Sequence, residues 1–432
     1  MWKKLWKSIA AGTVLAGLCI CLAASDATAS IEGLTGSSFT LTAKTGNITT
    51  GDGGSVFIWG YANGGSTVQY PGPTLILQQN DMITVTLNNQ LNVPVSIVFP
   101  GQTGVNATGG VQGLLTREAP PGGSVTYTFR ALQPGTYAYH SGTDIALQIE
   151  MGLVGAIIVR PSGAAMTAYG TADSMYDHEY LFLLTEMDPR IHEIVRFQGP
   201  EGLAGKNYLT NYFPVLWFIN GRCAPDTMLD SGVPWLPAQP YNCMPMMHPG
   251  ERLLMRVIGG GRDLHPFHHH GNHARVIARD GRLLESTSGA GADLSHEVFT
   301  IQSVPGKTAD AIFEWTGKGL GWDIYGHTPE DPLQPNEYAP DHGKPFPVML
   351  PEKQDLTFGA MYGGSPFLGV QGGLPPGQGT ENAEGFFSYM WHSHTEKEMV
   401  NYDVFPGGMM TMLVIVPPGV PIGMPMEQRE EK

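Results

Sequence analysis

The sequence predicts an all-β protein built from two β-sandwich domains. Glycine (57) and proline (34) are abundant in the 432 residues and only 15% are charged, a composition typical of turn-rich β proteins. Short segments alternate apolar and polar side chains with a period of two between Gly and Pro turns, which indicates half-buried strands. A chain of this length is long enough for two or three domains with cores of their own.

The first 29 residues resemble an export signal. Lys3, Lys4 and Lys7 precede an apolar stretch, and Ala27-Thr28-Ala29 provides small residues at a cleavage site. The apolar stretch, 9–24, is shorter than the ~20 residues that a spanning helix needs, so we expect cleavage and not anchoring. The prediction is a periplasmic or secreted protein with no stable membrane span.

The chain is acidic, with a formal net charge of −15. Loss of the lysine-bearing signal makes the remaining protein more acidic still. A negative surface repels phosphate backbones, so nucleic acid is excluded as a partner. The charge suits metal-ion or cationic substrates, although a solubilising surface explains it equally well.

Residues 31–161 predict the first sandwich. Its candidate strands are 39–42, 55–59, 82–87, 95–99, 124–129, 136–140 and 153–159. Pro-Gly and Gly-Gly dipeptides separate them, as in an antiparallel sandwich. No part of this region shows helical periodicity over a useful length.

Residues 178–420 predict the second sandwich, which follows a linker of small residues. Its candidate strands are 180–184, 215–219, 252–257, 311–315 and 411–416. A Gly/Pro-rich insertion, 317–385, interrupts it. Loops of that length are usually functional, oligomer-forming or mobile, and the sequence does not choose among these.

The two predicted domains carry the same short motif. Tyr-Ala-Tyr-His-Ser at 137–141 matches Tyr-Met-Trp-His-Ser at 389–393. In both places an apolar strand ending in proline follows. A repeat that carries the same histidine on the same strand predicts two copies of one domain.

Two His-x-His pairs are the strongest functional signal. His268 and His270 form the first pair, and His392 and His394 form the second. Alternate residues of an extended strand point to one face, and neutral imidazole is a usual ligand for copper and zinc. The pairs therefore predict one metal site, provided that the fold brings their strands together. The alternative is a pair of surface histidine clusters.

Cys223 and Cys243 are the two cysteines outside the signal. In an exported protein the expected outcome is a disulfide between them. The alternative is a thiolate metal ligand.

The histidine motifs resemble those of the multicopper oxidases, in particular two-domain members built from cupredoxin-like Greek-key β-sandwiches. Residues 265–271 match the family pattern His-Pro-x-His-x-His-Gly. The resemblance implies that His265 is a blue-copper ligand and that His268 and His270 are ligands of the copper cluster.

The fourth family motif is partly kept. His392 and His394 fit its cluster positions, but Ser393 stands where the family has cysteine. A serine hydroxyl cannot form the short thiolate bond of a blue-copper site. An electron relay feeding a three-copper cluster is therefore not supported.

The first two family motifs are degraded. Residues 96–101 occupy the place of the first motif, with Val98 and Pro100 at its histidine positions. The second motif keeps His140 and has Gly142 where its other histidine belongs. The cluster histidines that remain are His140, His268, His270, His392 and His394.

Two further groups have two interpretations each. Met244, Met246 and Met247 beside His248 could bind Cu(I) or fill a core. Glu396 and Glu398, in the turn after the fourth motif, could shuttle protons to bound oxygen or lie in a solvated charged turn.

The resemblance implies a reduced copper site between domains, with copper as cofactor. It would place His140 with His394 on one ion and His270 with His392 on its neighbour. The expected activity is a copper-dependent oxidoreductase acting directly on a small-molecule or metal-ion substrate. Two-domain relatives also imply a homotrimer. The alternatives are an inactive cupredoxin scaffold that serves as a binding or structural protein and, with the least support, copper storage.

Overall fold

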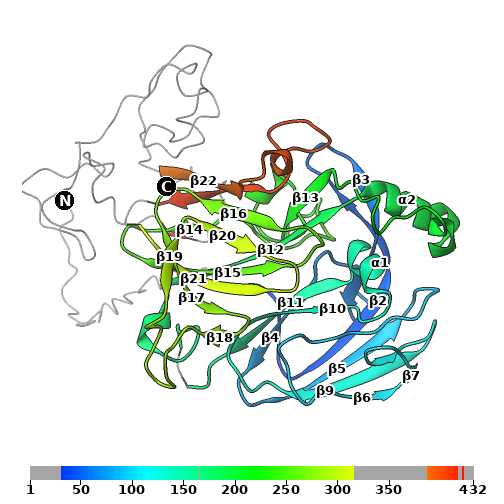
Figure 1. Cartoon of the computed structure of the whole chain (residues 1–432), viewed down its shortest axis with the longest axis horizontal. Coiled ribbons are helices and arrows are strands. Elements are labelled where there is room, and N and C mark those ends of the chain that lie inside the picture. Colours follow the sequence, from blue (N-terminus) through cyan, green and yellow to red (C-terminus); the bar gives the residue numbers. More distant parts are fainter. Residues whose placement is uncertain (1–30, 164, 316–386, 417–420, 423–432) are drawn as a thin grey trace, which may run out of the picture.

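The computed structural model of the chain describes residues 31–163, 165–315, 387–416 and 421–422 (Figure 1). The predicted signal (1–29) and the predicted insertion (317–385) lie outside the described residues. Within the described part, no helix is long and apolar enough to cross a membrane. Export and cleavage stay predictions.

The predicted all-β fold with two cupredoxin-like sandwiches is confirmed. In the first sandwich a five-stranded sheet, β3-β2-β5-β9-β6, faces a four-stranded sheet, β1-β4-β11-β10. Its strands are β1 (Leu34–Thr35), β2 (Ser38–Thr49), β3 (Ser55–Asn63), β4 (Gly72–Gln78), β5 (Met82–Asn89), β6 (Asn106–Gly109), β7 (Val111–Gln112), β8 (Arg117–Glu118), β9 (Ser124–Arg130), β10 (Gly135–His140) and β11 (Val154–Arg160).

The second sandwich has a larger sheet containing β13-β12-β15-β21-β17-β18 and a five-stranded sheet, β14-β23-β22-β16-β20. Its strands are β12 (His178–Met187), β13 (Leu216–Ile219), β14 (Met246–Met247), β15 (Arg252–Gly259), β16 (His265–His269), β17 (Ala274–Arg279), β18 (Arg282–Leu283), β19 (His296–Val298), β20 (Thr300–Ser303), β21 (Thr308–Glu314), β22 (Phe387–Ser393) and β23 (Met410–Ile415).

Strand pairing shows that the two sandwiches share one topology. β2 runs parallel to β5, which pairs antiparallel with β9; β12, β15 and β21 repeat this arrangement. In the other sheets, β10 pairs antiparallel with β11, which is parallel to β4, and β22, β23 and β14 repeat that arrangement. The short motif repeat in the sequence thus corresponds to a repeat of whole sheets.

Three apolar clusters hold the sandwiches together. One core fills the first domain around Leu77 and Val85, and another fills the second domain around Phe182 and Trp391. A third cluster contains side chains of both domains and so joins them, for example Ile58 with Leu183. Burying one such aliphatic or aromatic side chain stabilises the fold by about 1.5–3 kcal/mol.

Two short helices were not predicted from the sequence: α1 (Ile145–Glu150) and α2 (Pro189–Gln198). The ends of α2 follow local rules. The Asp188 side chain accepts a hydrogen bond from Arg190 N, Pro189 occupies the first turn, and Gly199 ends the helix with φ 70°. The Asp-Pro start and the Gly end were readable signals. The candidate strand at 95–99 forms only isolated bridges, at Val95 and Val98.

The predicted disulfide does not form in the structure, where Cys223 and Cys243 are both free and buried. Cys223 packs in the cluster that joins the domains, whereas Cys243 packs inside the second core. Burial raises the pKa of the Cys243 thiol to about 12 and raises the pKa of Cys223 well above its ordinary value. Neutral buried thiols also argue against the thiolate-ligand alternative.

Candidate metal centre

The two His-x-His pairs lie on neighbouring strands of one sheet. β16 and β22 pair antiparallel, with His268 directly opposite His392. His270, just beyond β16, continues the contact, since its backbone N–H donates to Met390 O at 3.2 Å. The Trp391 indole N–H donates to His270 O at 3.0 Å and holds that turn in place. The fold therefore brings together the strands that the sequence singled out.

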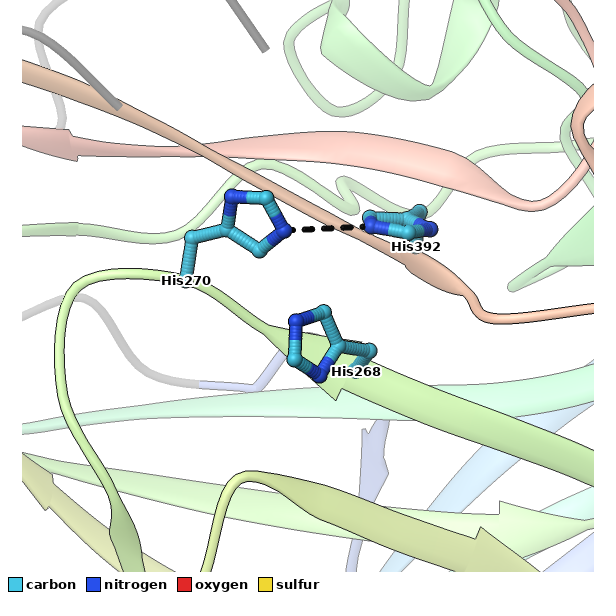
Figure 2. A group of neighbouring side chains, drawn as sticks. All are labelled: His268, His270 and His392. Carbon is cyan, nitrogen blue, oxygen red and sulfur yellow. Dashed lines mark hydrogen bonds between the residues drawn. The ribbon is translucent and has the colours of Figure 1, made fainter. Parts of the chain in front are cut away.

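Three of the imidazoles converge (Figure 2). One ring nitrogen each of His268, His270 and His392 can be chosen so that all three lie within 4.8 Å of one another. The Nε2 atoms of His270 and His392 are 3.3 Å apart. Two nitrogens bound tetrahedrally to one ion at about 2.0–2.1 Å would be about 3.3 Å apart. The spacing and the nitrogen donors thus fit a copper or zinc ion.

Hydrogen bonds behind the rings fix their orientation. His392 Nδ1 donates to Ser393 O at 2.7 Å, which places the proton on Nδ1 and leaves the Nε2 lone pair for a ligand. His268 Nδ1 lies 2.9 Å from Thr300 Oγ1, so its other nitrogen faces the group. Such supporting bonds are typical of metal-binding histidines.

The electrostatic surroundings favour the neutral form of His392 and His268. The pKa of His392 is lowered to about 4, chiefly by burial and also by the neighbouring imidazoles, while the hydrogen bond to Ser393 O acts in the opposite direction. The pKa of His268 is also lowered, by burial and then by the proximity of His270 and His394. Neutral imidazole is the form that binds metal.

His394 and His140 do not belong to the group of three. The His394 ring lies at its edge, 4.9 Å from the His268 ring centroid, and is exposed. His140, at the end of β10 in the first domain, repeats the local geometry of His392, because its Nδ1 donates to Ser141 O at 2.8 Å. Of the pairing that the resemblance implied, His270 and His392 are brought together, and His140 is not in either of the candidate metal groups among the described residues.

Strand register explains what the first domain lacks. Val98 forms a backbone bridge with His140, just as His268 stands opposite His392 in the second domain. The first domain therefore has a valine side chain at the position where the second has a ligating imidazole.

His265 lies apart from the predicted metal group and is engaged by two acids. Its Nε2 is 2.8 Å from Glu186 Oε2 and its Nδ1 is 2.8 Å from Glu398 Oε2, all three side chains being buried. Burial alone would lower the pKa of His265, but the two carboxylates raise it to about 9. A protonated ring with both nitrogens occupied has no lone pair for copper, which argues against the blue-copper role.

Ser393 belongs to the same buried network. Its hydroxyl donates to Glu398 Oε2 at 2.5 Å. Glu398 is therefore not in a solvated turn, since only 2% of it is exposed. Sequence reasoning missed Glu186, although an acid inside the apolar strand β12 was a visible signal.

We expect that Ser393→Cys will not create a blue-copper site. The new thiolate would face the Glu398 carboxylate, and His265 would remain bound to Glu186 and Glu398. Intense blue absorption needs a short copper–thiolate bond together with histidine ligands. Absorption spectra after Cu(II) loading check this, and a strong thiolate-to-copper band would contradict it.

The methionines near His248 are packing residues. Met244 and Met246 lie in an apolar cluster with Val416 and Ile422, and Met247 lies in the second core. Side chains so placed have their sulfurs among apolar neighbours. The copper-storage interpretation loses its basis.

Known proteins that resemble this chain are multicopper oxidases and their relatives. A multicopper oxidase family model matches residues 45–164. The iron transport multicopper oxidase of Epichloe festucae is 44% identical over 94 residues, 21% of this chain and 15% of its own length. Copper resistance protein A of Escherichia coli is 33% identical over 127 residues, 29% of this chain and 20% of its own. Laccase 1 of Metarhizium robertsii is 28% identical over 208 residues, which are 43% of this chain and 33% of its own length.

Solved structures show the fold over nearly the whole chain, whereas the curated relatives match only part of their own length. The blue copper oxidase of Nitrosomonas europaea superposes with a TM-score of 0.57 at 18% identity, covering 91% of this chain and 90% of its own. The multicopper oxidase mgLAC superposes with a TM-score of 0.55 at 18% identity, covering 89% of this chain and 87% of its own. The chain is therefore similar to multicopper oxidases, a family whose cofactor is copper, in sequence over residues 45–164 and in fold over nearly its whole length.

Proposed function

We propose that this protein is an exported, copper-dependent oxidoreductase that binds copper at His268, His270 and His392. The observation that carries the proposal is the convergence of three imidazoles from two paired strands. His394, at the rim, is a further candidate ligand.

Bound copper would supply one-electron redox chemistry. The protein's own part is to hold three nitrogens in place through Ser393 O, Thr300 and Trp391. Because the relay position is filled by an imidazolium between two carboxylates, electrons would come straight from a substrate at the histidine group.

We propose a small-molecule or metal-ion substrate. The relatives are named for iron transport, copper resistance and laccase activity. A periplasmic or secreted location suits such substrates and follows from the predicted signal. The homotrimer would bring the His140 of a neighbouring copy toward the group; light scattering of the copper-loaded protein is the measurement that checks this.

The proposal is tested by copper content and oxygen consumption. The protein freed of its signal should retain copper after loading with Cu(II) and desalting, without strong blue colour, and should consume oxygen with cuprous ion or a phenol. His392→Ala should weaken copper binding by more than about 100-fold, because losing a ligand costs more than losing its supporting partner, which costs about 10–100-fold.

His296→Ala is the matched control. This histidine is exposed on β19, and its Nε2 lies 3.4 Å from Arg279 Nη2. The control should keep copper and oxygen consumption at the unmodified level. Equal copper content in His392→Ala and the unmodified protein would refute the site.

A specific observation favours a second candidate, an inactive cupredoxin scaffold that serves as a binding or structural protein. The first domain offers one histidine, His140, with Val98 opposite it, and the other three cluster positions of its motifs, Val98, Pro100 and Gly142, carry no imidazole. Copper retention without oxygen consumption above that of free copper would select this candidate.

A further inference from the structure

We propose that His178, His248 and Glu251 form a second metal site, for a divalent ion such as Zn(II) or Cu(II). One ligand atom from each of these side chains lies within 4.8 Å of the other two. Two imidazoles and one carboxylate are a nitrogen–oxygen donor set that suits ions of intermediate softness. The proposal does not depend on the proposed function.

The carboxylate connects the two rings. Glu251 Oε2 lies 2.8 Å from His178 Nε2, and Glu251 Oε1 lies 3.0 Å from His248 Nδ1. Ligands around one ion at about 2.0–2.2 Å are about 3.3–3.5 Å apart. An ion would therefore need the donor atoms to separate by about half an ångström, which the partly exposed His248 and Glu251 side chains allow while the buried His178 stays in place.

The elements that carry these residues are held by backbone hydrogen bonds. His178 begins β12, and Leu253 of β15 is its partner across the parallel pair. Gly250, in the turn between His248 and Glu251, adopts φ 81°, and its N–H donates to Trp315 O at 2.6 Å. The turn and the strand end therefore present the three side chains to one another in a fixed arrangement.

Burial and charge suit a bound cation with one open side. His178 is buried, with a side-chain exposure of 3%, whereas His248 and Glu251 are partly exposed at 14% and 22%. Glu251 is the one carboxylate of the three side chains, and its negative charge suits a divalent cation.

This second site is separate from the histidine group on β16 and β22. Met410, at one end of β23, stands opposite His392, while Ile415, at the other end, stands opposite Met247, next to His248. Five residues of strand span roughly 16 Å. A substitution at one site therefore leaves the ligands of the other in place, so that each site can be tested separately.

Zinc binding in a background without the first site tests the proposal. The variant His268→Ala/His270→Ala/His392→Ala should still bind about one equivalent of zinc in a calorimetric titration, whereas the unmodified chain should bind about two. Adding His248→Ala should weaken the remaining equivalent by more than about 100-fold. No zinc binding in the triple variant would overturn the proposal.

Two further variants keep the test decisive. His178→Gln, at the buried ligand, should also remove the remaining equivalent, and circular dichroism must show that it folds. His296→Ala, added to the triple variant, should leave that equivalent in place. If His248→Ala and His178→Gln both fold and both retain zinc, the three residues form only a hydrogen-bonded cluster. Activity is not used in either readout, so failure here leaves the proposed function standing.

Discussion

Replacing Arg256 with methionine should lower the free energy of unfolding by about 3–5 kcal/mol, the usual cost of removing one partner from a buried ion pair. This fully buried guanidinium lies 3.0 Å from Glu179 and 3.8 Å from Asp310. It also donates to Thr136 Oγ1 at 2.9 Å, on β10 of the first sandwich. Methionine keeps much of the length but removes the charge. Because Arg160 still pairs with Glu179, Asp310 is the carboxylate left without a cation.

Urea denaturation followed by tryptophan fluorescence measures this loss. Arg252→Met is the matched control, because Arg252 lies on the same strand and pairs with Glu314 at 3.1 Å in a partly exposed position. Exposed pairs contribute about 0–1 kcal/mol. If Arg256→Met costs no more than Arg252→Met, the buried network between the sandwiches contributes little stability.

The strands and the metal group could be predicted because both depend on local periodicity. Alternation identified most of the long strands, and it also placed His268 and His270 on one face. Since the same strand motif recurs around His140 and His392, the two-domain arrangement followed from the sequence. The prediction of a strand at 95–99 failed because a proline and a glycine follow the segment closely. Only Val95 and Val98 form bridges with another segment.

The buried ion pairs could not be predicted, because they join residues far apart in the chain. Glu186 and His265 are separated by 79 positions, and His265 and Glu398 by 133. Periodicity indicates which side chains face inward, but not which strands become neighbours. The disulfide prediction failed for the same reason, since bonding of Cys223 to Cys243 depends on a separation that composition does not reveal.

Replacing His265 with glutamine should also lower the free energy of unfolding by about 3–5 kcal/mol. The substitution removes the cation between two buried carboxylates. Glu186 keeps the backbone N–H groups of Arg262 and Asp263 as donors, at 2.6 and 3.0 Å. Among the described residues, Glu398 keeps a single donor, the Ser393 hydroxyl at 2.5 Å, so its charge is the less compensated of the two. The double variant His265→Gln/Glu398→Gln, in which that charge is also removed, should therefore be more stable than the single variant in urea denaturation.

The pH dependence of stability distinguishes loss of charge from loss of packing at His265. The pKa of this imidazole in the fold is about 9, above the ordinary value of about 6.5, so folding favours the protonated ring. Its contribution is complete below about pH 6.5 and is lost as the pH rises through about 9, which amounts to roughly 3 kcal/mol. Other groups titrate in the same range, but the unmodified protein and His265→Gln share them. The difference in unfolding free energy between the two proteins should therefore shrink from about pH 6.5 to about pH 10. A difference that stays constant over this range would show that His265 is neutral in the folded protein.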